Sequence, residues 1–145
     1  MKTLIARLVG TLEIAGGLFG LFTYGARAFE LRAPLPFALL LLGALAFALA
    51  LAAGVKLLEG DERGWCWSSW VQLAQIPILG TPIFGYGWNV GAIAELGARV
   101  GGGWRFGYQL PSVGWLLRVG DSHGWFLGIN FVAVIAFLLL RLARR

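Results

Sequence analysis

The first residue of this sequence that could do chemistry is Glu13, the only charged residue between Arg7 and Arg27. An ionised carboxylate inside a bilayer costs at least about 2.5 kcal/mol, so such a group normally faces protein or water. Glu13 therefore predicts one of two environments. Either it binds a proton or a cation, or it accepts hydrogen bonds from polar side chains on a neighbouring segment.

A second group of polar residues recurs at intervals of three and four, the spacing of one helix face. Its polar members are Gln72, Gln75, Tyr86 and Asn89, with Leu79 and Pro82 completing the spacing. Together with Glu13 and Asn130, this stripe predicts a ligand or ion path through an apolar environment. The alternative is that the amides hydrogen-bond to Glu13 and Asn130 and hold helices together, an effect of about 1 kcal/mol per contact.

Sequence motifs of common enzyme classes are missing. The sequence contains no Walker-type phosphate loop, no dinucleotide-binding glycine motif, no HExxH and no GxSxG. Cys66 is the only cysteine, which excludes an internal disulfide and a Cys-rich metal site. We therefore expect no catalytic residue, no metal and no cofactor, and we predict that the chain is not an enzyme.

The composition points to a membrane. Hydrophobic residues make up 59% of the 145 residues and charged residues 13%, with a mean hydropathy of +0.77. Soluble domains carry about 25% charged residues, and a domain this small cannot bury so large an apolar fraction. The sequence predicts a single integral membrane domain over residues 1–145, and it excludes a disordered chain, a disulfide scaffold and an ordinary cytosolic enzyme.

The charged residues separate four apolar windows, each long enough for the roughly 20 residues with which a helix crosses the hydrocarbon. Helices are expected in all of them because lipid cannot satisfy exposed backbone groups and no repeated strand pattern indicates a barrel. The predicted fold class is an all-α integral membrane protein. Its four transmembrane helices are expected near residues 4–24, 36–57, 70–94 and 124–141.

Two features interrupt this regular pattern. Pro77 and Pro82 each remove a backbone donor and clash with the preceding turn, so the third helix is expected to kink or break there. Residues 96–123 combine glycine and proline turns with alternating aromatic residues. They predict a short non-helical or hairpin segment on the outer side, which either lies on the bilayer or re-enters it.

Small residues at helical spacing predict close contacts between helices. They are Gly10, Gly16, Gly17 and Gly20 in the first window, Ala46, Ala50 and Gly54 in the second, and Gly124 and Gly128 in the fourth. Tryptophan favours the interface between membrane and water. The expected interfacial tryptophans are Trp65, Trp67, Trp70, Trp104, Trp115 and Trp125.

The flanking Lys and Arg residues favour an orientation with both termini in the cytoplasm, because positive charge accumulates on that side of short loops. The cytoplasmic set is Lys2, Arg7, Lys56, Arg63, Arg141, Arg144 and Arg145, and the opposite set is Arg27, Arg32, Arg99, Arg105 and Arg118. We expect the bacterial inner membrane. The basic pI of about 10.2 then reflects contact with lipid headgroups, and no nucleic-acid partner is expected.

Two functions fit these patterns. The first is a small multi-span membrane protein that acts through helix packing, as an accessory subunit of a membrane complex or as a homo-oligomer. The alternative is a small oligomeric channel or transporter whose polar path is lined by Glu13, Gln72, Gln75 and Asn89. A hydrated cavity around Glu13 and Gln75 favours transport, whereas contact between these side chains in a dry seam favours packing.

Overall fold

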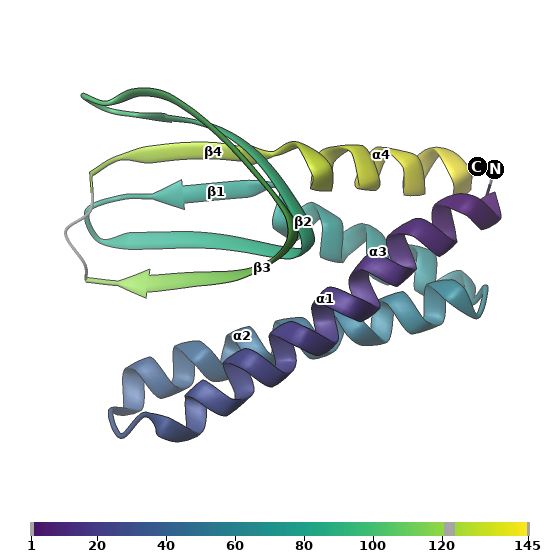
Figure 1. Cartoon of the computed structure of the whole chain (residues 1–145), viewed down its shortest axis with the longest axis horizontal. Helices are drawn as coiled ribbons and strands as arrows, with labels where there is room; N and C mark the ends of the chain where they lie inside the picture. Colours follow the sequence, from purple (N-terminus) through teal and green to yellow (C-terminus); the bar gives the residue numbers. More distant parts are fainter. Residues whose placement is uncertain (1, 121–123, 145) are drawn as a thin grey trace.

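The computed structural model describes residues 2–120 and 124–144, which form helices on one side and a β-sheet on the other (Figure 1). The helices are α1 (Lys2–Glu30), α2 (Pro34–Leu58), α3 (Glu62–Gln75) and α4 (Phe131–Arg144). The strands are β1 (Pro77–Gly80), β2 (Phe84–Arg99), β3 (Gly103–Val119) and β4 (Phe126–Asn130). The two ends of the chain lie side by side at the helical end of the molecule (Figure 1).

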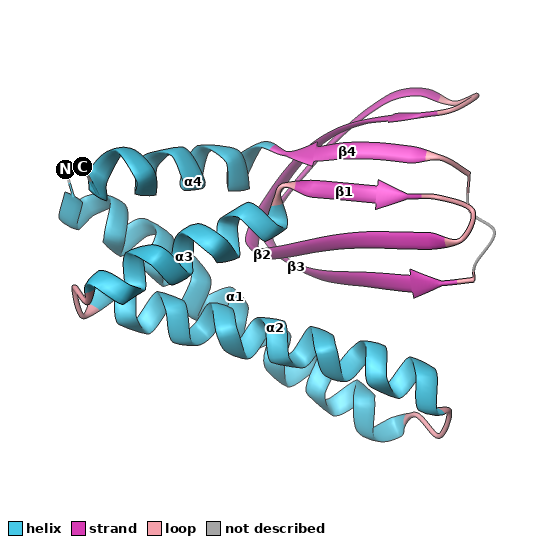
Figure 2. Cartoon of the chain, turned by 180° about the vertical axis from the view of Figure 1, so that it is seen from behind, coloured by secondary structure: helices cyan, strands magenta, loops and turns pink. Residues whose placement is uncertain are grey.

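Helices α1 and α2 form a long antiparallel hairpin (Figure 2). They contain 29 and 25 residues, so they are about 43 and 37 Å long, more than the roughly 30 Å of a bilayer's hydrocarbon. Their mean hydropathies are 1.6 and 2.5 over the most apolar windows. Both helices are therefore long and apolar enough to cross a membrane, and they contain the expected spans 4–24 and 36–57.

Local sequence signals set where two helices begin. Pro34 is the first residue of α2. Proline is favoured there because the N–H that it lacks would have no hydrogen-bond partner in the first turn of a helix. Asp61 caps α3 by accepting a hydrogen bond from the backbone N–H of Arg63 at 2.9 Å. This bond and the nearby Lys56 ammonium lower the pKa of Asp61.

The sheet has the strand order β1-β4-β2-β3, with β1 pairing with β2 as well, and every pair is antiparallel. Strand β1 lies beside the start of β2, at Gly85 and Tyr86, and β4 lies beside its end, from Glu95 to Arg99. Because β1 and β4 also pair with each other, β2 has to bend between these regions. The sheet consequently curves into a half-barrel (Figure 2).

The bend in β2 is at Gly91, where φ is +83° and the register with β3 shifts. A Cβ at this position would lie 2.9 Å from the carbonyl oxygen of Leu12 in α1. Glycine is the residue that accommodates both the positive φ and this close approach. The bend is therefore also the place where the sheet meets the helical hairpin.

The prediction of an all-α fold with four transmembrane helices is wrong. Among the described residues, α1 and α2 alone pass the length and hydropathy test for a membrane span. The expected third helix, 70–94, ends at Gln75, and the chain continues as a strand from Pro77. The helix does not kink at Pro82, which lies in the turn between β1 and β2.

The expected fourth helix and the expected outer segment also contain strands. Residues 124–141 begin outside any helix or strand, form β4, and become helical only at Phe131. Of the expected outer segment 96–123, residues 96–119 are not a short loop, because they complete β2 and form all of β3, and residues 121–123 lie outside the described residues. The hairpin that does form runs from Phe84 to Val119 and is the largest element of the sheet.

Two apolar clusters hold the helices and the sheet together. One joins the ends of α1, α2 and α4 near the chain termini and contains Ile5, Ala6, Val9, Leu57, Leu140 and Ala143. The other joins α2, α3 and β2 and contains Phe47, Ala50, Ala53, Val71, Trp88 and Val90. Trp88 and Val90 of this second cluster are two positions apart, so their side chains lie on the same face of β2. That face packs against the helices.

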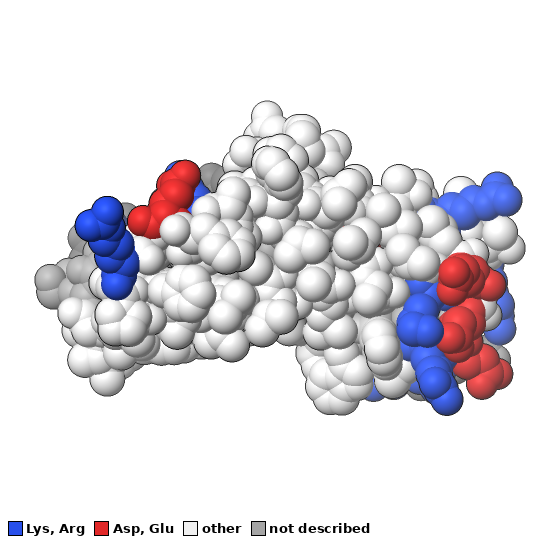
Figure 3. All heavy atoms as spheres, turned by 90° about the horizontal axis from the view of Figure 1, so that it is seen from below, with Lys and Arg blue, Asp and Glu red and all other residues white. Residues whose placement is uncertain are grey.

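Charged side chains are separated along the molecule. The face drawn in Figure 3 carries Lys, Arg, Asp and Glu at its two ends and an uncharged surface between them. Large apolar side chains are exposed on the hairpin, including Phe19 (64%), Phe22 (78%) and Phe29 (87%). Such a band is typical of proteins that contact lipid or another protein.

Candidate functional site

Glu13 lies in a buried seam between α1 and α3. Its carboxylate accepts hydrogen bonds from Ser68 Oγ at 2.6 Å and from Gln72 Nε2 at 2.9 Å. Glu13 and Ser68 are completely buried and Gln72 is almost so. The seam therefore satisfies the carboxylate with two neutral donors.

Gln75 extends this seam by one helical turn. Its Oε1 accepts a hydrogen bond from the backbone N–H of Val90 at 2.7 Å, and its Nε2 donates to the carbonyl of Val71 at 3.2 Å. Gln75 is 1% exposed. It therefore ties the end of α3 to β2 close to the bend at Gly91.

The other predicted path residues lie apart from this seam. Tyr86 donates to the carbonyl of Ala74 at 2.6 Å, and Asn89 donates to Ser112 Oγ at 2.7 Å. Asn130 caps α4, because its Oδ1 accepts from the backbone N–H of Val132 at 3.1 Å. These residues do not form one helix face, since Tyr86 and Asn89 lie on a strand with opposite orientations.

Several predicted packing glycines lie at close helix contacts. A Cβ at Gly17 would lie 2.7 Å from the Leu51 backbone nitrogen in α2, and one at Gly54 would lie 2.7 Å from the carbonyl oxygen of Gly10. A Cβ at Gly20 would collide with Phe47. Ala50 is fully buried and Ala46 is half-buried on the same helix.

Three predicted packing positions differ from a helix–helix contact. Gly16 of α1 faces Gly91 of β2, so the first helix packs against a strand at this point. Gly128 lies in β4 beside Phe126, and Gly124 precedes that strand with open space around it. The expected packing of Gly124 and Gly128 in a fourth helix is therefore wrong.

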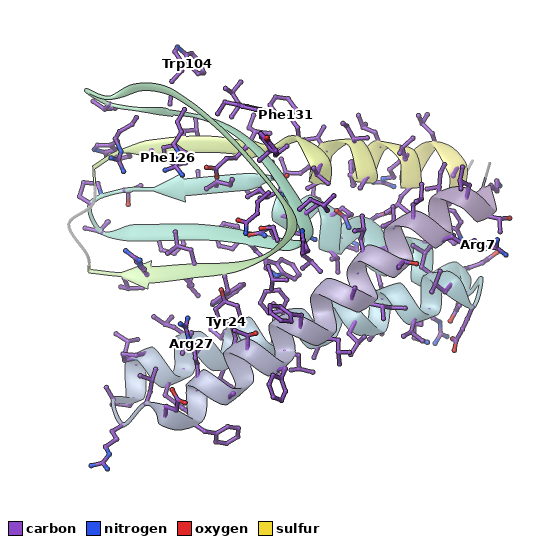
Figure 4. The ribbon with its side chains drawn as sticks, viewed as in Figure 1. Arg7, Tyr24, Arg27, Trp104, Phe126 and Phe131 are labelled. Carbon is purple, nitrogen blue, oxygen red and sulfur yellow. The ribbon has the colours of Figure 1, made fainter. Side chains whose placement is uncertain are left out.

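The predicted interfacial tryptophans divide into exposed and buried residues. Trp67, Trp70, Trp104 and Trp125 are exposed, and Trp104 projects away from the sheet (Figure 4). Trp65 packs on the cluster at the chain termini. Trp115 is half-buried: its ring contacts Tyr86 and Trp88 and donates its N–H to the carbonyl of Leu39.

The concave face of the half-barrel forms a pocket that the sequence did not predict. Residues on this face alternate along each strand with those of the convex face. Pairing places Arg105 opposite Gly97, Arg118 opposite Gly85, and Phe126 opposite Arg99. The two glycines have no side chain, so they leave space on the concave face for the arginines and for the ring of Phe126.

This pocket has a volume of about 240 Å³ and combines apolar and charged walls. Its apolar wall includes Ile78, Leu116 and Phe126, and its charged residues are Glu95, Arg99, Arg105 and Arg118. Glu95 Oε1 pairs with Arg105 at 3.4 Å, and the Glu95 side chain is only 18% exposed. A second cavity of about 230 Å³ shares Ile78, Glu95 and Leu116 with the first and continues toward Trp115.

Sequence reasoning missed this pocket because it placed residues 70–94 in one helix. The informative pattern was period-two alternation. In residues 84–90, large side chains at Phe84, Tyr86, Trp88 and Val90 alternate with Gly85, Gly87 and Asn89. The same alternation places Glu95, Gly97 and Arg99 on one face of a strand.

The described residues contain no group of three or more His, Cys, Asp or Glu side chains that could hold a metal ion. Comparison of the chain with protein-family models, with curated proteins and with solved structures gave no match. The seam around Glu13, the open sheet and the pocket are the features of the molecule that bear on function.

Proposed function

We propose that the chain is an integral membrane protein that acts by packing against another membrane-protein chain. The α1–α2 hairpin is long enough to cross the bilayer, and its exposed apolar side chains, such as Phe22 and Phe29, suit contact with lipid. The proposal assigns the chain no catalytic residue, no cofactor and no nucleic-acid partner. Its location is the bacterial inner membrane, with both termini in the cytoplasm.

The distribution of basic residues supports this orientation. The two chain ends lie together, and the turn between α2 and α3 lies at the same end of the molecule (Figure 1). Lys2, Arg7, Lys56, Arg63, Arg141 and Arg144 belong to these segments. The positive-inside rule places such an end in the cytoplasm.

The open edge of β3 is the observation that carries the packing proposal. Among the described strands, β3 is hydrogen-bonded only to β2, although it contains 17 residues. Open sheet edges do not occur in contact with the hydrocarbon of a bilayer, because their backbone groups find no partner there. On the helical side, Tyr24 Oη accepts a hydrogen bond from the backbone N–H of Trp115 in β3 at 2.9 Å. Any other part of the edge that enters the hydrocarbon needs a partner chain.

A second copy of this chain is the partner that fits this edge. Two β3 strands that pair in antiparallel fashion about a twofold axis satisfy each other's backbone groups with one identical surface. Three exposed aromatic side chains adjoin this edge, namely Trp104 (79%), Phe106 (66%) and Tyr108 (81%). Their apolar area favours burial in such a dimer.

The contacts within the seam do not favour the alternative function, a channel or transporter with a polar path. Glu13, Gln72 and Gln75 use their polar atoms on one another, on Ser68 and on the backbone. Ion or proton flux in proteoliposomes that Glu13→Gln abolishes would count against the packing proposal.

Cysteine cross-linking in native membranes tests the proposal. We expect Tyr108→Cys, in a Cys66→Ser background, to form a disulfide-linked dimer under mild oxidation. The matched control is Phe22→Cys, which is similarly exposed but lies on α1, and which should remain monomeric. A link from Tyr108→Cys to a different protein would identify a heteromeric subunit. Equal dimer formation by both variants, or none from any exposed position of β3, would contradict the role of this edge.

A further inference from the structure

The pocket of the half-barrel concentrates positive charge around a partly apolar cavity. Arg99, Arg105 and Arg118 bring three positive charges, and Glu95 brings one negative charge, so the lining carries a net charge of +2. Glu95, Arg99 and Arg105 lie near the turn of the β2–β3 hairpin, whereas Arg118 lies near its other end, opposite Gly85. Their convergence follows from the bend in β2, because that bend brings the two ends of the hairpin around the same concave face.

The chemistry of these side chains selects a particular kind of ligand. Guanidinium groups present several N–H donors in a planar fork that matches the oxygens of a phosphate. The Glu95 carboxylate has acceptor oxygens and lies inside the same pocket, so it suits a ligand that also carries hydroxyl or ammonium donors. The wall formed by Leu116 and Phe126 suits an apolar continuation of that ligand.

We propose that this pocket binds the phosphate headgroup of an anionic phospholipid, with Arg99 and Arg105 on the phosphate and Glu95 on a headgroup hydroxyl. The adjoining cavity toward Trp115 provides further space along the concave face. A free phosphate ester presents the same anion without the acyl chains. The experiment therefore compares both sources.

The position of the pocket agrees with a headgroup ligand. The open end of the half-barrel and the α1–α2 turn lie at the same end of the molecule, opposite the chain termini (Figure 1). When the α1–α2 hairpin crosses a bilayer, this end of the molecule reaches the lipid headgroups on the side opposite the chain termini. This placement depends on the proposed membrane insertion, whereas binding by the pocket itself is measurable in detergent.

Lipid binding to the purified full-length protein in detergent tests the proposal by native mass spectrometry. The probes are phosphatidylglycerol, phosphatidylcholine and glycerol phosphate. We expect phosphatidylglycerol to bind the wild type most tightly, and Arg99→Gln to weaken that binding about tenfold, the loss typical of one charge-assisted contact. Gly85→Leu should weaken it similarly, because a Cβ at Gly85 meets only ordinary contacts beyond 3.6 Å and the larger side chain fills the pocket.

The matched control is Arg27→Gln, which removes one exposed positive charge at the same end of the molecule but outside the pocket. It should bind phosphatidylglycerol as the wild type does. Equal weakening by Arg27→Gln and Arg99→Gln would overturn the site in favour of general surface attraction. Glycerol phosphate binding as tight as phosphatidylglycerol binding would overturn the lipid as the source. Neither result depends on whether β3 forms a dimer, so this test and that of the proposed function fail separately.

Discussion

Gly16→Ala is expected to destabilise the folded protein by about 1–3 kcal/mol, the usual cost of inserting a methyl group into a filled contact. A Cβ at Gly16 would collide with the backbone nitrogen of Gly91. Backbone at this point cannot move aside easily, because Gly91 has a positive φ and lies at the bend of β2. The substitution therefore separates α1 from the sheet at their central contact.

Unfolding in mixed detergent micelles measures this loss, and Gly25→Ala is the matched control on the same helix. A Cβ at Gly25 meets no atom within 4 Å. Because alanine is the better helix former, Gly25→Ala should raise stability, by up to about 1 kcal/mol. Equal effects of the two alanines would show that the contact between α1 and β2 does not limit stability.

Glu13→Ala is expected to cause the other large loss. It removes the acceptor of two buried hydrogen bonds and leaves Ser68 Oγ and Gln72 Nε2 without their partner. Each buried polar group left unpaired costs about 1–3 kcal/mol, so for these two groups we expect a total of about 2–6 kcal/mol. The same unfolding measurement in mixed micelles reports it.

Glu13→Gln separates hydrogen bonding from charge. Its carbonyl oxygen still accepts a bond from Gln72 or Ser68, so the variant should recover at least half of the stability that Glu13→Ala loses. Ser68→Ala removes one of the two donors and should cost less than Glu13→Ala. A Glu13→Ala protein as stable as the wild type would contradict the structural role of the seam.

The sequence was sufficient to predict the two helices of the hairpin, and a hydrogen bond from an amide to Glu13 was one of the two environments that it left open. The α1–α2 hairpin could be predicted because two apolar windows are both long and rich in residues that favour helices. Glu13 and Gln72 were accessible because a carboxylate in an apolar stretch requires a polar neighbour. Ser68 was missed, since a single serine four residues before Gln72 resembles many other serines in helices.

The sheet was missed because an uncharged window does not distinguish a helix from a strand. Gln72, Gln75, Tyr86 and Asn89 fit a helical spacing by coincidence across a break at Pro77. Alternation of glycine with aromatic residues from Phe84 onward contained the correct signal. The closure of β1, β4 and β2 around a common face depends on pairing between distant residues, which a single sequence does not reveal.

The pocket is formed by the sheet, so it could not be predicted once the sheet had been missed. Arg99, Arg105 and Arg118 were assigned to a membrane flank, which accounts for their charge but not for their convergence. On a helix or a loop these residues need not meet. Antiparallel pairing of β2 with β3, together with the bend at Gly91, brings them to one cavity.

Accessibility of the two turns to a membrane-impermeant thiol reagent tests the central claim that α1 and α2 cross a bilayer. The measurement uses Arg32→Cys, between α1 and α2, and Glu59→Cys, between α2 and α3, each in a Cys66→Ser background. Both positions are exposed. We expect intact cells to label Arg32→Cys and to label Glu59→Cys only after permeabilisation. Labelling of both positions in intact cells, or of neither until permeabilisation, would contradict a hairpin that spans the membrane.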